Sequence, residues 1–305
     1  MKIILKYRLF CLLLLVAGAA RSQVDFVFDD ITKPDSFSIP FSVHQSLIQV
    51  DITLNGKNEK FVLDNGAPYL VMNAGHFNKV IETDTLIKAK GIGGKVDAGS
   101  FAIDSFSWQG IEKNNFKAIA ADLPLLGDSI AGLLGVNVYR DYKMTFDYDS
   151  NRITFVKPIF DTSNNLRAVV TDSLPFALHM PVITLLINGD SLKMGVDCGA
   201  STGLLTADKL AVVGSLANFR QTVMTGAGTP AMVVEGDVKE IIIEGVSYKN
   251  MKFAFNDASI HQINQVSNIK LDGLLGLPFL MKYKTVIDFP NRRLEIYPEE
   301  RDVDL

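Results

Sequence analysis

Two stretches of the sequence decide the fold: KFVLDNGAPYLVMN, from Lys60 to Asn73, and MGVDCGASTGLLT, from Met194 to Thr206. In each stretch an apolar run typical of a buried strand leads to one aspartate, Asp64 or Asp197, and a glycine follows two residues later. A carboxylate is seldom placed at the end of a buried strand without a partner. The recurrence of the pattern indicates that the two aspartates belong to one arrangement.

The chain of 305 residues contains the same series of features twice. The features keep their order, and their spacing grows only from 133 to 141 residues, which predicts two tandem lobes of one fold. We place the lobes at residues 43–158 and 175–305, with a linker at 159–174 and an N-terminal segment at 23–42. The paired features are Asn55-Gly56 with Asn188-Gly189, Asp64–Ala67 with Asp197–Ala200, Gly91–Gly94 with Gly226–Gly228, Gly132–Gly135 with Gly273–Gly276, and Asp147 with Asp288.

Each lobe is predicted to be rich in β-strands. Apolar residues alternate with polar residues from Ile48 to Leu54, and Asn55-Gly56 then favours a two-residue hairpin turn. The second lobe repeats this pattern around Asn188-Gly189. We therefore expect an all-β protein. Short helices are predicted only at Ala74–Val80, Val136–Tyr142, Ala207–Ala211 and Pro278–Tyr283.

The N-terminus is typical of an export signal. Lys2, Lys6 and Arg8 precede or flank an apolar run from Leu9 to Ala20, and residues 1–22 are therefore predicted to be a cleaved signal peptide. An apolar run of this length is too short to span a bilayer comfortably, so we expect no stable membrane span after cleavage. The protein is expected to be exported, either to a periplasm or out of the cell.

Composition narrows the possible partners and stabilising features. The net charge is −4 and no basic stripe is present, so we do not expect nucleic acid as a partner. Loss of the signal peptide removes Cys11 and leaves Cys198 as the single cysteine, so the mature chain cannot form an internal disulfide. Its stability is expected to come from the core, since 48% of its residues are hydrophobic.

Two aspartates on facing turns can carry out acid–base chemistry. If the lobes pack about a pseudo-twofold axis, Asp64 and Asp197 face each other and cannot both ionise cheaply, so they share a proton. The ionised carboxylate can then take a proton from water while the protonated one donates to a carbonyl oxygen. This pair would hydrolyse an amide bond without a metal or a covalent intermediate.

The arrangement resembles the two-lobed aspartic peptidases of the pepsin and retropepsin type over nearly the whole mature chain. The Asp-Thr-Gly motif of that family corresponds to Asp64-Asn65-Gly66 and Asp197-Cys198-Gly199. The resemblance implies a bilobal fold of two tandem retropepsin-like β-barrels, related by pseudo-twofold symmetry, in which Asp64 and Asp197 are catalytic. It also implies a monomer, because one chain supplies both lobes, and it implies peptide or protein substrates and no cofactor.

The resemblance also assigns supporting roles around the two turns. The later hydrophobic-hydrophobic-Gly motif is matched by Leu133-Leu134-Gly135 and Leu274-Leu275-Gly276, which would support the turns from beneath. The turns themselves would be shaped by Asn65, Gly66, Ala67, Cys198, Gly199 and Ala200. The flaps that close over a substrate would contain Gly91, Ile92, Gly93, Gly94, Gly226, Ala227 and Gly228.

The motif departs from the family at the threonines, which are replaced by Asn65 and Cys198. In the family that hydroxyl links each turn to the opposite one, and a cysteine thiol is only a weak donor. We therefore expect a looser pair of turns. Ala67 and Ala200 have no side-chain donor for the carboxylates, and the loss of a donor raises a carboxyl pKa. Activity is predicted to peak at a less acid pH than that of pepsin.

Two alternative functions remain open at this point. The first is a catalytically inactive member of the same fold that binds peptides or proteins. The second is a serine hydrolase, because Gly199-Ala200-Ser201-Thr202-Gly203 matches the G-x-S-x-G pattern, with Asp237, Asp257 and His261 downstream in the required order. That pattern requires a parallel α/β sheet, which the sequence does not predict.

Metal chemistry is not indicated by the sequence. Its four histidines, at positions 44, 76, 179 and 261, lack the spacing of metal ligands. We expect structural or surface roles for them, and no metal site.

Overall fold

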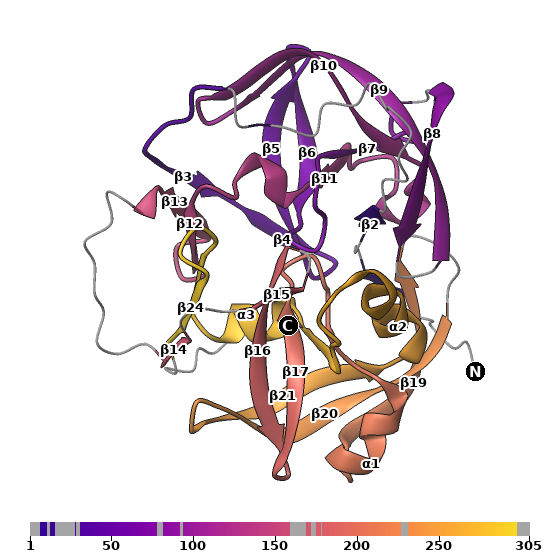
Figure 1. The fold of residues 1–305 in the computed structure, drawn as a ribbon, viewed down its shortest axis with the longest axis vertical. Coiled ribbons are helices and arrows are strands. Elements are labelled where there is room, and N and C mark those ends of the chain that lie inside the picture. Colours follow the sequence, from indigo (N-terminus) through magenta and orange to yellow (C-terminus); the bar gives the residue numbers. More distant parts are fainter. Residues whose placement is uncertain are drawn as a thin grey trace.

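The computed structural model describes residues 7–10, 13–15, 28, 31–77, 82–91, 94–158, 169–171, 175–177, 179–226 and 231–297. Figure 1 shows two lobes built mainly of strands, the first above the second. The all-β, bilobal prediction is confirmed. Within the described ranges, no helix has both the length and the apolar character needed to cross a membrane.

The first lobe is a closed β-barrel. Strands β5, β6, β11, β7, β10 and β9 are neighbours in that order, and a further pairing of β9 with β5 closes the ring. Strands β4 and β8 extend the sheet beyond the ring. The strands are β4 (Ser42–His44), β5 (Leu47–Leu54), β6 (Lys57–Leu63), β7 (Val71–Asn73), β8 (Glu82–Gly91), β9 (Gly94–Trp108), β10 (Ile111–Ala121) and β11 (Gly132–Leu134).

The second lobe repeats this topology strand for strand. Its ring consists of β16, β17, β22, β18, β21 and β20, closed by the pairing of β20 with β16. The positions of β15 and β19 match those of β4 and β8. The strands are β15 (Phe176–Ala177), β16 (Met180–Ile187), β17 (Asp190–Val196), β18 (Gly203–Leu205), β19 (Ala217–Gly226), β20 (Ala231–Ile243), β21 (Val246–Phe255) and β22 (Gly273–Leu275).

The equivalent hairpins have the turn chemistry that the sequence predicts. Asn55 and Gly56 have φ angles of 49° and 75°, and Asn188 and Gly189 have φ angles of 51° and 91°. Two consecutive positive φ angles characterise the type I′ turn, which matches the twist of the flanking strands. The turns fix the register of each hairpin, and so the positions at which β6 and β17 end.

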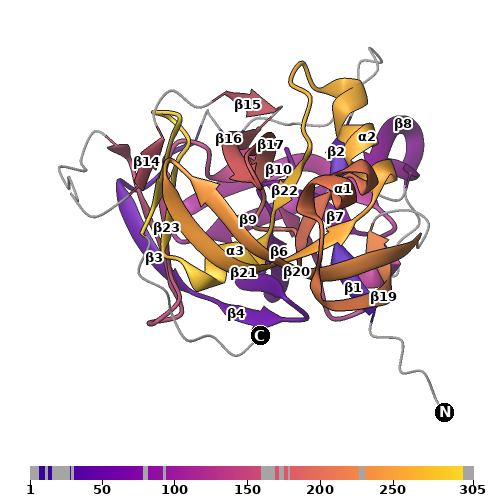
Figure 2. The ribbon, with the colours of Figure 1, turned by 90° about the horizontal axis from the view of Figure 1, so that it is seen from below.

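A six-stranded sheet joins the lobes beneath the barrels. It runs in the order β14-β24-β23-β12-β13-β3, and the pairing of β12 with β23 connects the first lobe to the second. Figure 2 shows β3, β14 and β23 together along one side of the molecule. The strands are β3 (Ser36–Pro40), β12 (Lys143–Asp147), β13 (Arg152–Val156), β14 (Val169–Thr171), β23 (Thr285–Asp288) and β24 (Arg293–Ile296).

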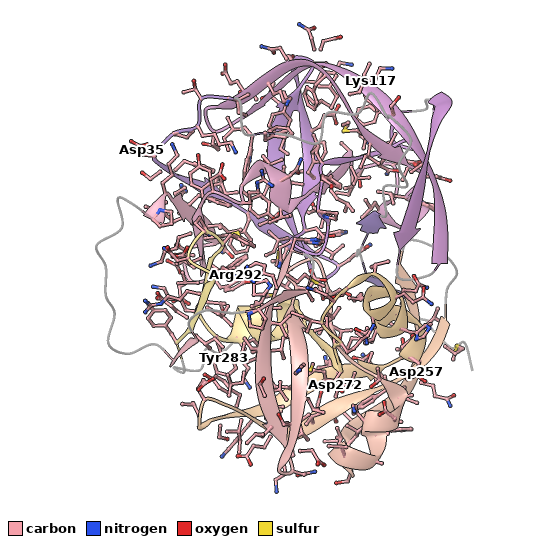
Figure 3. All side chains as sticks on the ribbon, in the orientation of Figure 1. Asp35, Lys117, Asp257, Asp272, Tyr283 and Arg292 are labelled. Carbon is pink, nitrogen blue, oxygen red and sulfur yellow. The ribbon has the colours of Figure 1, made fainter. Side chains whose placement is uncertain are left out.

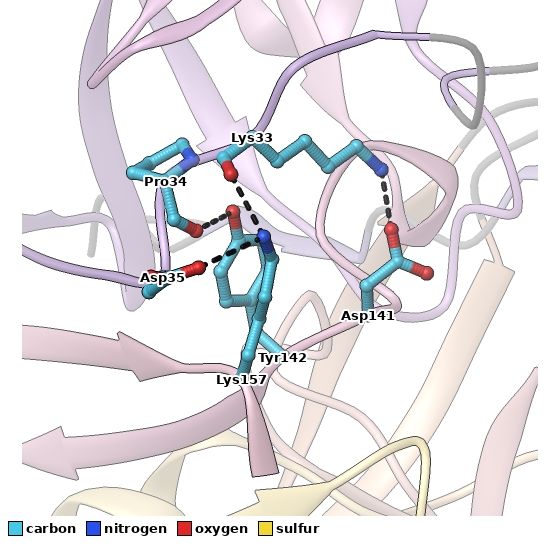
Figure 4. Close-up of polar contacts among 6 residues, drawn as sticks. All are labelled: Lys33, Pro34, Asp35, Asp141, Tyr142 and Lys157. Atoms are coloured by element: carbon cyan, nitrogen blue, oxygen red, sulfur yellow. Dashed lines mark hydrogen bonds and ion pairs between the residues drawn. The ribbon is translucent and has the colours of Figure 1, made fainter. Parts of the chain in front are cut away.

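The second half of the N-terminal segment is built into this sheet. Every residue of β3 pairs with β13, from Ser36 to Pro40. Just before β3, Lys33 Nζ lies 2.6 Å from Asp141 Oδ2, and Tyr142 donates its hydroxyl to the Pro34 carbonyl at 2.8 Å, as Figure 4 shows. Lys157 also donates to the Lys33 carbonyl at 2.8 Å. Residues 33–40 are therefore part of the fold.

The helices are short, and their positions differ from the prediction. Residues 74–77 form a turn, and the predicted helix at Val136–Tyr142 is limited to one 3₁₀ turn, η2 (Val136–Val138). The helix α2 (Asp257–Val266) was not predicted. The other helical elements are η1 (Pro124–Leu126), η4 (Ala207–Lys209), α1 (Leu210–Val213) and α3 (Leu277–Lys282).

The largest hydrophobic core is continuous through both lobes. It includes Trp108 and Phe106 of the first barrel and Ile287 of the joining sheet, all nearly inaccessible to solvent. Arg292, labelled in Figure 3, lies in the turn between β23 and β24, and its guanidinium lies 4.9 Å from the ring centroid of Phe176. The two lobes are thus held as one body, which fixes the relative position of the two turns.

Candidate active site

The two aspartates occupy equivalent positions at the ends of β6 and β17. β11 runs parallel to β6, and β22 runs parallel to β17. The Asp64 N–H donates to the Leu134 carbonyl at 3.1 Å, and the Asp197 N–H donates to the Leu275 carbonyl at 2.9 Å. The Leu-Leu-Gly motifs therefore hold the first residue of each turn, as predicted.

The glycine of each Leu-Leu-Gly motif lets a second segment approach its turn. A Cβ on Gly135 would lie 2.0 Å from the Tyr69 carbonyl oxygen, and one on Gly276 would lie 2.3 Å from the Thr202 carbonyl oxygen. The next residue then bonds to the turn: the Leu277 N–H donates to the Ala200 carbonyl at 2.7 Å. Each turn is consequently supported at both ends by backbone hydrogen bonds.

Backbone N–H groups bind one oxygen of each carboxyl group. Asp64 Oδ1 accepts from the N–H groups of Gly66, at 2.7 Å, and Ala67, at 3.1 Å. Asp197 Oδ1 accepts from the Gly199 N–H at 2.8 Å. The Oδ2 atoms of both aspartates are buried and accept no hydrogen bond from the described residues. Oδ2 is therefore the atom of each group left for a proton or for a bound reactant.

The two turns meet across the lobe interface. A Cβ on Gly199 would lie 2.1 Å from Asp64 Oδ1, so the Gly199 Cα packs directly against the carboxyl group of the other lobe. Both aspartates are fully buried. The structure thus brings together the two aspartates that the sequence singled out.

Asn65 links the two turns more firmly than expected. Its Nδ2 donates to the Val196 carbonyl at 2.8 Å, and its Oδ1 accepts from the Cys198 N–H at 2.6 Å. From the other side, the Cys198 thiol lies 3.5 Å from the Leu63 carbonyl, to which it donates. The expectation of a looser pair was wrong, because a single asparagine amide both donates and accepts across the interface.

Removing the Asn65 amide should loosen the interface. Asn65→Ala leaves the buried Cys198 N–H and Val196 carbonyl without partners, at a cost of about 1–3 kcal/mol for each group. Asn65→Thr keeps a hydroxyl that can both accept and donate. We expect denaturant unfolding to show a clear loss of stability for the alanine variant and little loss for the threonine variant. Equal loss in both variants would show that the two bonds are not what matters.

Burial and proximity shift the pKa values of the pair upward. Burial, followed by the charge of Asp197, raises the pKa of Asp64 well above its usual range, against the Gly66 and Ala67 hydrogen bonds, which lower it. Burial raises the pKa of Asp197 to about 7. Two such carboxyls with bare Oδ2 atoms favour a state in which at least one proton is held between them.

Neighbouring groups keep the surroundings of the pair uncharged. Burial, and then the charges of Asp197 and Asp64, raise the pKa of the Cys198 thiol well above its usual range, so the thiol stays protonated and can donate. Burial likewise raises the pKa of Tyr139, on which Cys198 and both aspartates also act. The charge that develops during any reaction is therefore confined to the two carboxyls.

His179 is a contact that the sequence did not predict. It lies between β15 and β16 of the second lobe, and its Nε2 lies 2.6 Å from the Gly66 carbonyl of the first lobe. Burial lowers the pKa of His179 to about 4, although its bond to Gly66 raises it and part of the ring remains exposed. The ring is therefore neutral near pH 7, with its proton on Nε2.

This contact distinguishes the two turns. The Gly66 carbonyl and the Ala67 N–H belong to one peptide group, and that N–H donates to Asp64. A donor on the carbonyl polarises the peptide group and strengthens its N–H as a donor. His179 therefore supports the second hydrogen bond to Asp64, and at the spacing of 133 residues its counterpart in the first lobe is Ser46.

Replacing His179 should separate hydrogen bonding from packing. Gln has an amide nitrogen at a similar distance from the backbone as Nε2, so His179→Gln is expected to keep the bond to Gly66, whereas His179→Leu leaves that carbonyl without its donor. We expect the leucine variant to lose about 1 kcal/mol or more of unfolding free energy and the glutamine variant to lose much less. A glutamine variant as unstable as the leucine variant would contradict this role.

The predicted flap residues lie at the ends of two equivalent hairpins. Gly91 ends β8 and pairs with Gly94, the first residue of β9. Gly226 ends β19, whose partner strand β20 begins at Ala231. Ile92, Gly93, Ala227 and Gly228 lie outside the described residues.

The serine-hydrolase site does not assemble. Ser201 is buried, and among the described residues its hydroxyl has no hydrogen-bond partner, so it has no histidine base. Asp257, labelled in the second lobe in Figure 3, accepts from the Ala207 N–H at 2.7 Å, and Asp237 accepts from Asn218 at 2.6 Å. The G-x-S-x-G match is therefore a part of the second turn, not a nucleophile site.

No cluster of three or more histidine, cysteine or acidic residues in the described part of the chain could hold a metal ion.

Comparison with known proteins places the chain in a family. The sequence model of the family described as Aspartyl protease matches residues 50–138 and 183–279, which is more than half of the chain and includes both turns. The chain belongs to the aspartyl protease family. Each match covers one of the two lobes, so the duplication is a family feature of this aspartyl protease relative.

Solved structures agree with the family at the level of the fold. The aspartic proteinase from Irpex lacteus has a TM-score of 0.51 and 13% identity, over 87% of this chain and 98% of that one. Conglutin gamma, a basic 7S globulin from lupine seeds, has a TM-score of 0.49 and 11% identity, over 88% and 96% of the two chains. No curated protein matches this aspartyl protease relative.

Proposed function

We propose that this protein is an aspartic endopeptidase in which Asp64 and Asp197 hydrolyse peptide bonds. The observation that carries the proposal is the meeting of two buried carboxyl groups across the lobe interface, with one oxygen of each left without a protein donor. Family membership supports this reading.

The chemistry uses water and one shared proton. The ionised carboxylate takes a proton from water as the water oxygen attacks the carbonyl carbon, while the protonated carboxyl donates to the carbonyl oxygen. In the second step the C–N bond breaks, the amine nitrogen takes up a proton, and the carbonyl re-forms as a carboxylic acid. The pair ends with one proton, ready for the next cycle.

The proposed substrate is an extended peptide held beneath the two hairpins β8–β9 and β19–β20. Strand edges bind extended peptides through backbone hydrogen bonds. Both lobes come from one chain, so we propose that the protein works as a monomer. We also propose that it acts after export, in a periplasm or outside the cell.

A peptide-binding protein without turnover is the second candidate. The observation in its favour is that both carboxyls are 0% exposed, so that a reacting peptide and water require the structure to open. The two candidates differ in whether a bound peptide is cut.

A peptide library separates these functions. The purified protein is incubated with diverse peptides from pH 3 to pH 8, beside a Ser201→Ala variant. We expect cleavage that the Ser201→Ala variant retains. Folded protein that binds library peptides without cutting them would replace the peptidase with the binding protein, and cleavage lost with Ser201 would restore the hydrolase.

A further inference from the structure

Two strands from the N-terminal residues lie along the flap strands of both lobes. β1 (Tyr7–Phe10) runs parallel to β19, in register from Val223 to Gly226. β2 (Leu13–Leu15) runs antiparallel to β8, in register from Gly91 back to Ala89. Figure 1 shows β2 beside β8, and Figure 2 shows β1 beside β19.

The two pairings occupy equivalent positions. β1 is the end strand of the second lobe's sheet next to β19, and β2 is the end strand of the first lobe's sheet next to β8. β8 and β19 correspond in the duplication, so a twofold axis makes them run in opposite directions along a line that crosses the axis. A single segment crossing from one to the other must be parallel to one and antiparallel to the other, which is what the pairings show.

The register places the crossing at the flap ends. Phe10 pairs with Gly226 and Leu13 pairs with Gly91, and these glycines are the last residues of β19 and β8. Only two residues separate Phe10 from Leu13. One short segment therefore passes from the flap of one lobe directly to the flap of the other.

We propose that residues 7–15 are an internal occupant of the peptide channel, which excludes other extended peptides for as long as these residues remain attached. This inference rests on the proposed function, and it specifies both how the site is regulated and what it binds. A strand edge that is already paired cannot accept a second strand. Removal of residues 1–22, the predicted export signal, would free both edges.

The same pairings describe the ligand that the channel accepts. It is an extended, largely apolar peptide long enough to reach both flaps, because the occupant YRLFCLLLL between Tyr7 and Leu15 has that composition. A tethered segment competes at a high effective concentration, so it can block the channel even where its intrinsic affinity is modest.

Proline substitutions test the occupancy in the full chain. The 305-residue protein is produced in a cell-free system without membranes or signal peptidase. Leu13→Pro/Leu14→Pro removes two backbone N–H groups from β2, whereas the matched control Leu13→Val/Leu14→Val keeps them. Because β2 is an end strand, neither change touches a barrel ring.

Two readouts are compared. In peptide cleavage we expect the proline variant to have a KM about tenfold or more below that of the wild type and the valine control, with kcat unchanged, as for the release of a tethered competitor. In fluorescence anisotropy, a labelled peptide of residues 5–17 should bind the proline variant and not the wild type.

The outcomes separate the two proposals. If no form cleaves peptides and the labelled peptide still binds only the proline variant, the occupancy stands and the peptidase function fails. Equal KM values together with equal binding of the labelled peptide to wild type and proline variant would overturn the occupancy. If the valine control behaves like the proline variant, backbone pairing is not what holds the segment, and the proposal also fails.

Discussion

Replacing either aspartate with asparagine is expected to lower kcat/KM for peptide cleavage by about 10³-fold or more, because each variant removes one partner of the shared proton. Asparagine preserves the shape and can still accept the turn hydrogen bonds, such as that from Gly199 to position 197 at 2.8 Å. The fold should therefore survive. Steady-state kinetics of Asp64→Asn and Asp197→Asn, each checked by circular dichroism, measure the effect.

The stability of the asparagine variants gives this prediction an independent control. Burial raises the pKa of Asp197 from 3.8 to about 7, so the folded state holds a proton that the unfolded chain releases as the pH rises through this interval. The wild type thus loses stability between these values, by an amount on the order of a few kcal/mol, and Asp197→Asn does not. We expect the variant to be the more stable at pH 7.5 and the difference to shrink below pH 4. Equal stability at both values would contradict the raised pKa.

Gly199→Ala is expected to have the second largest effect. The new methyl group would lie 2.1 Å from Asp64 Oδ1 and 2.3 Å from Asp64 Cγ, both far inside contact distance. The turns must separate to admit it, which we expect to cost roughly 1–3 kcal/mol or more of stability. A displacement of about 1 Å between the carboxyls should lower kcat/KM by about 10²-fold.

Gly75→Ala is the matched control for this variant. Its Cβ would meet Asn73 Oδ1 and Asp122 Oδ1 at 3.5 Å, which is ordinary van der Waals contact. Chemical unfolding and peptide cleavage of the two variants are compared directly. A Gly199→Ala protein as stable and as active as Gly75→Ala would mean that the turns are not pressed together as described.

The duplicated features made the fold predictable from the sequence. A spacing near 133 residues paired Asn55-Gly56 with Asn188-Gly189, and the positive φ angles of both turns follow from those residue types. The same spacing paired Asp64 with Asp197, which the structure brings to one interface. Local turn chemistry and repetition are both written in the chain, so they can be read without coordinates.

Contacts that depend on how the lobes pack could not be read in this way. His179 has no motif around it, and its bond to Gly66 exists only because the second lobe places the β15–β16 turn beside the first. Asn65 appeared to be a weakened motif residue until the structure showed both ends of its amide bonded across the interface. Tertiary geometry decided both cases.

The helix α2 had a local signal that was overlooked. Asn256 caps it by accepting from the Ser259 N–H, and Asp257 places an acidic residue in its first turn. Ile260 and Ile263 then form a buried stripe at a helical spacing. Its ten residues lie in a lobe otherwise made of strands, and the cap followed by this spacing was sufficient to predict it.

The most direct test of the central claim, a proton shared between Asp64 and Asp197, is the pH profile of kcat/KM for one cleaved peptide from pH 2 to pH 9. Activity requires one carboxyl protonated and the other ionised, so the profile should be bell-shaped, with limbs that belong to the pair. Because burial raises both pKa values, and that of Asp197 to about 7, we predict that activity rises from pH 3 towards neutrality. A maximum near pH 2, or a rate independent of pH across the range, would contradict the shared proton in these buried surroundings.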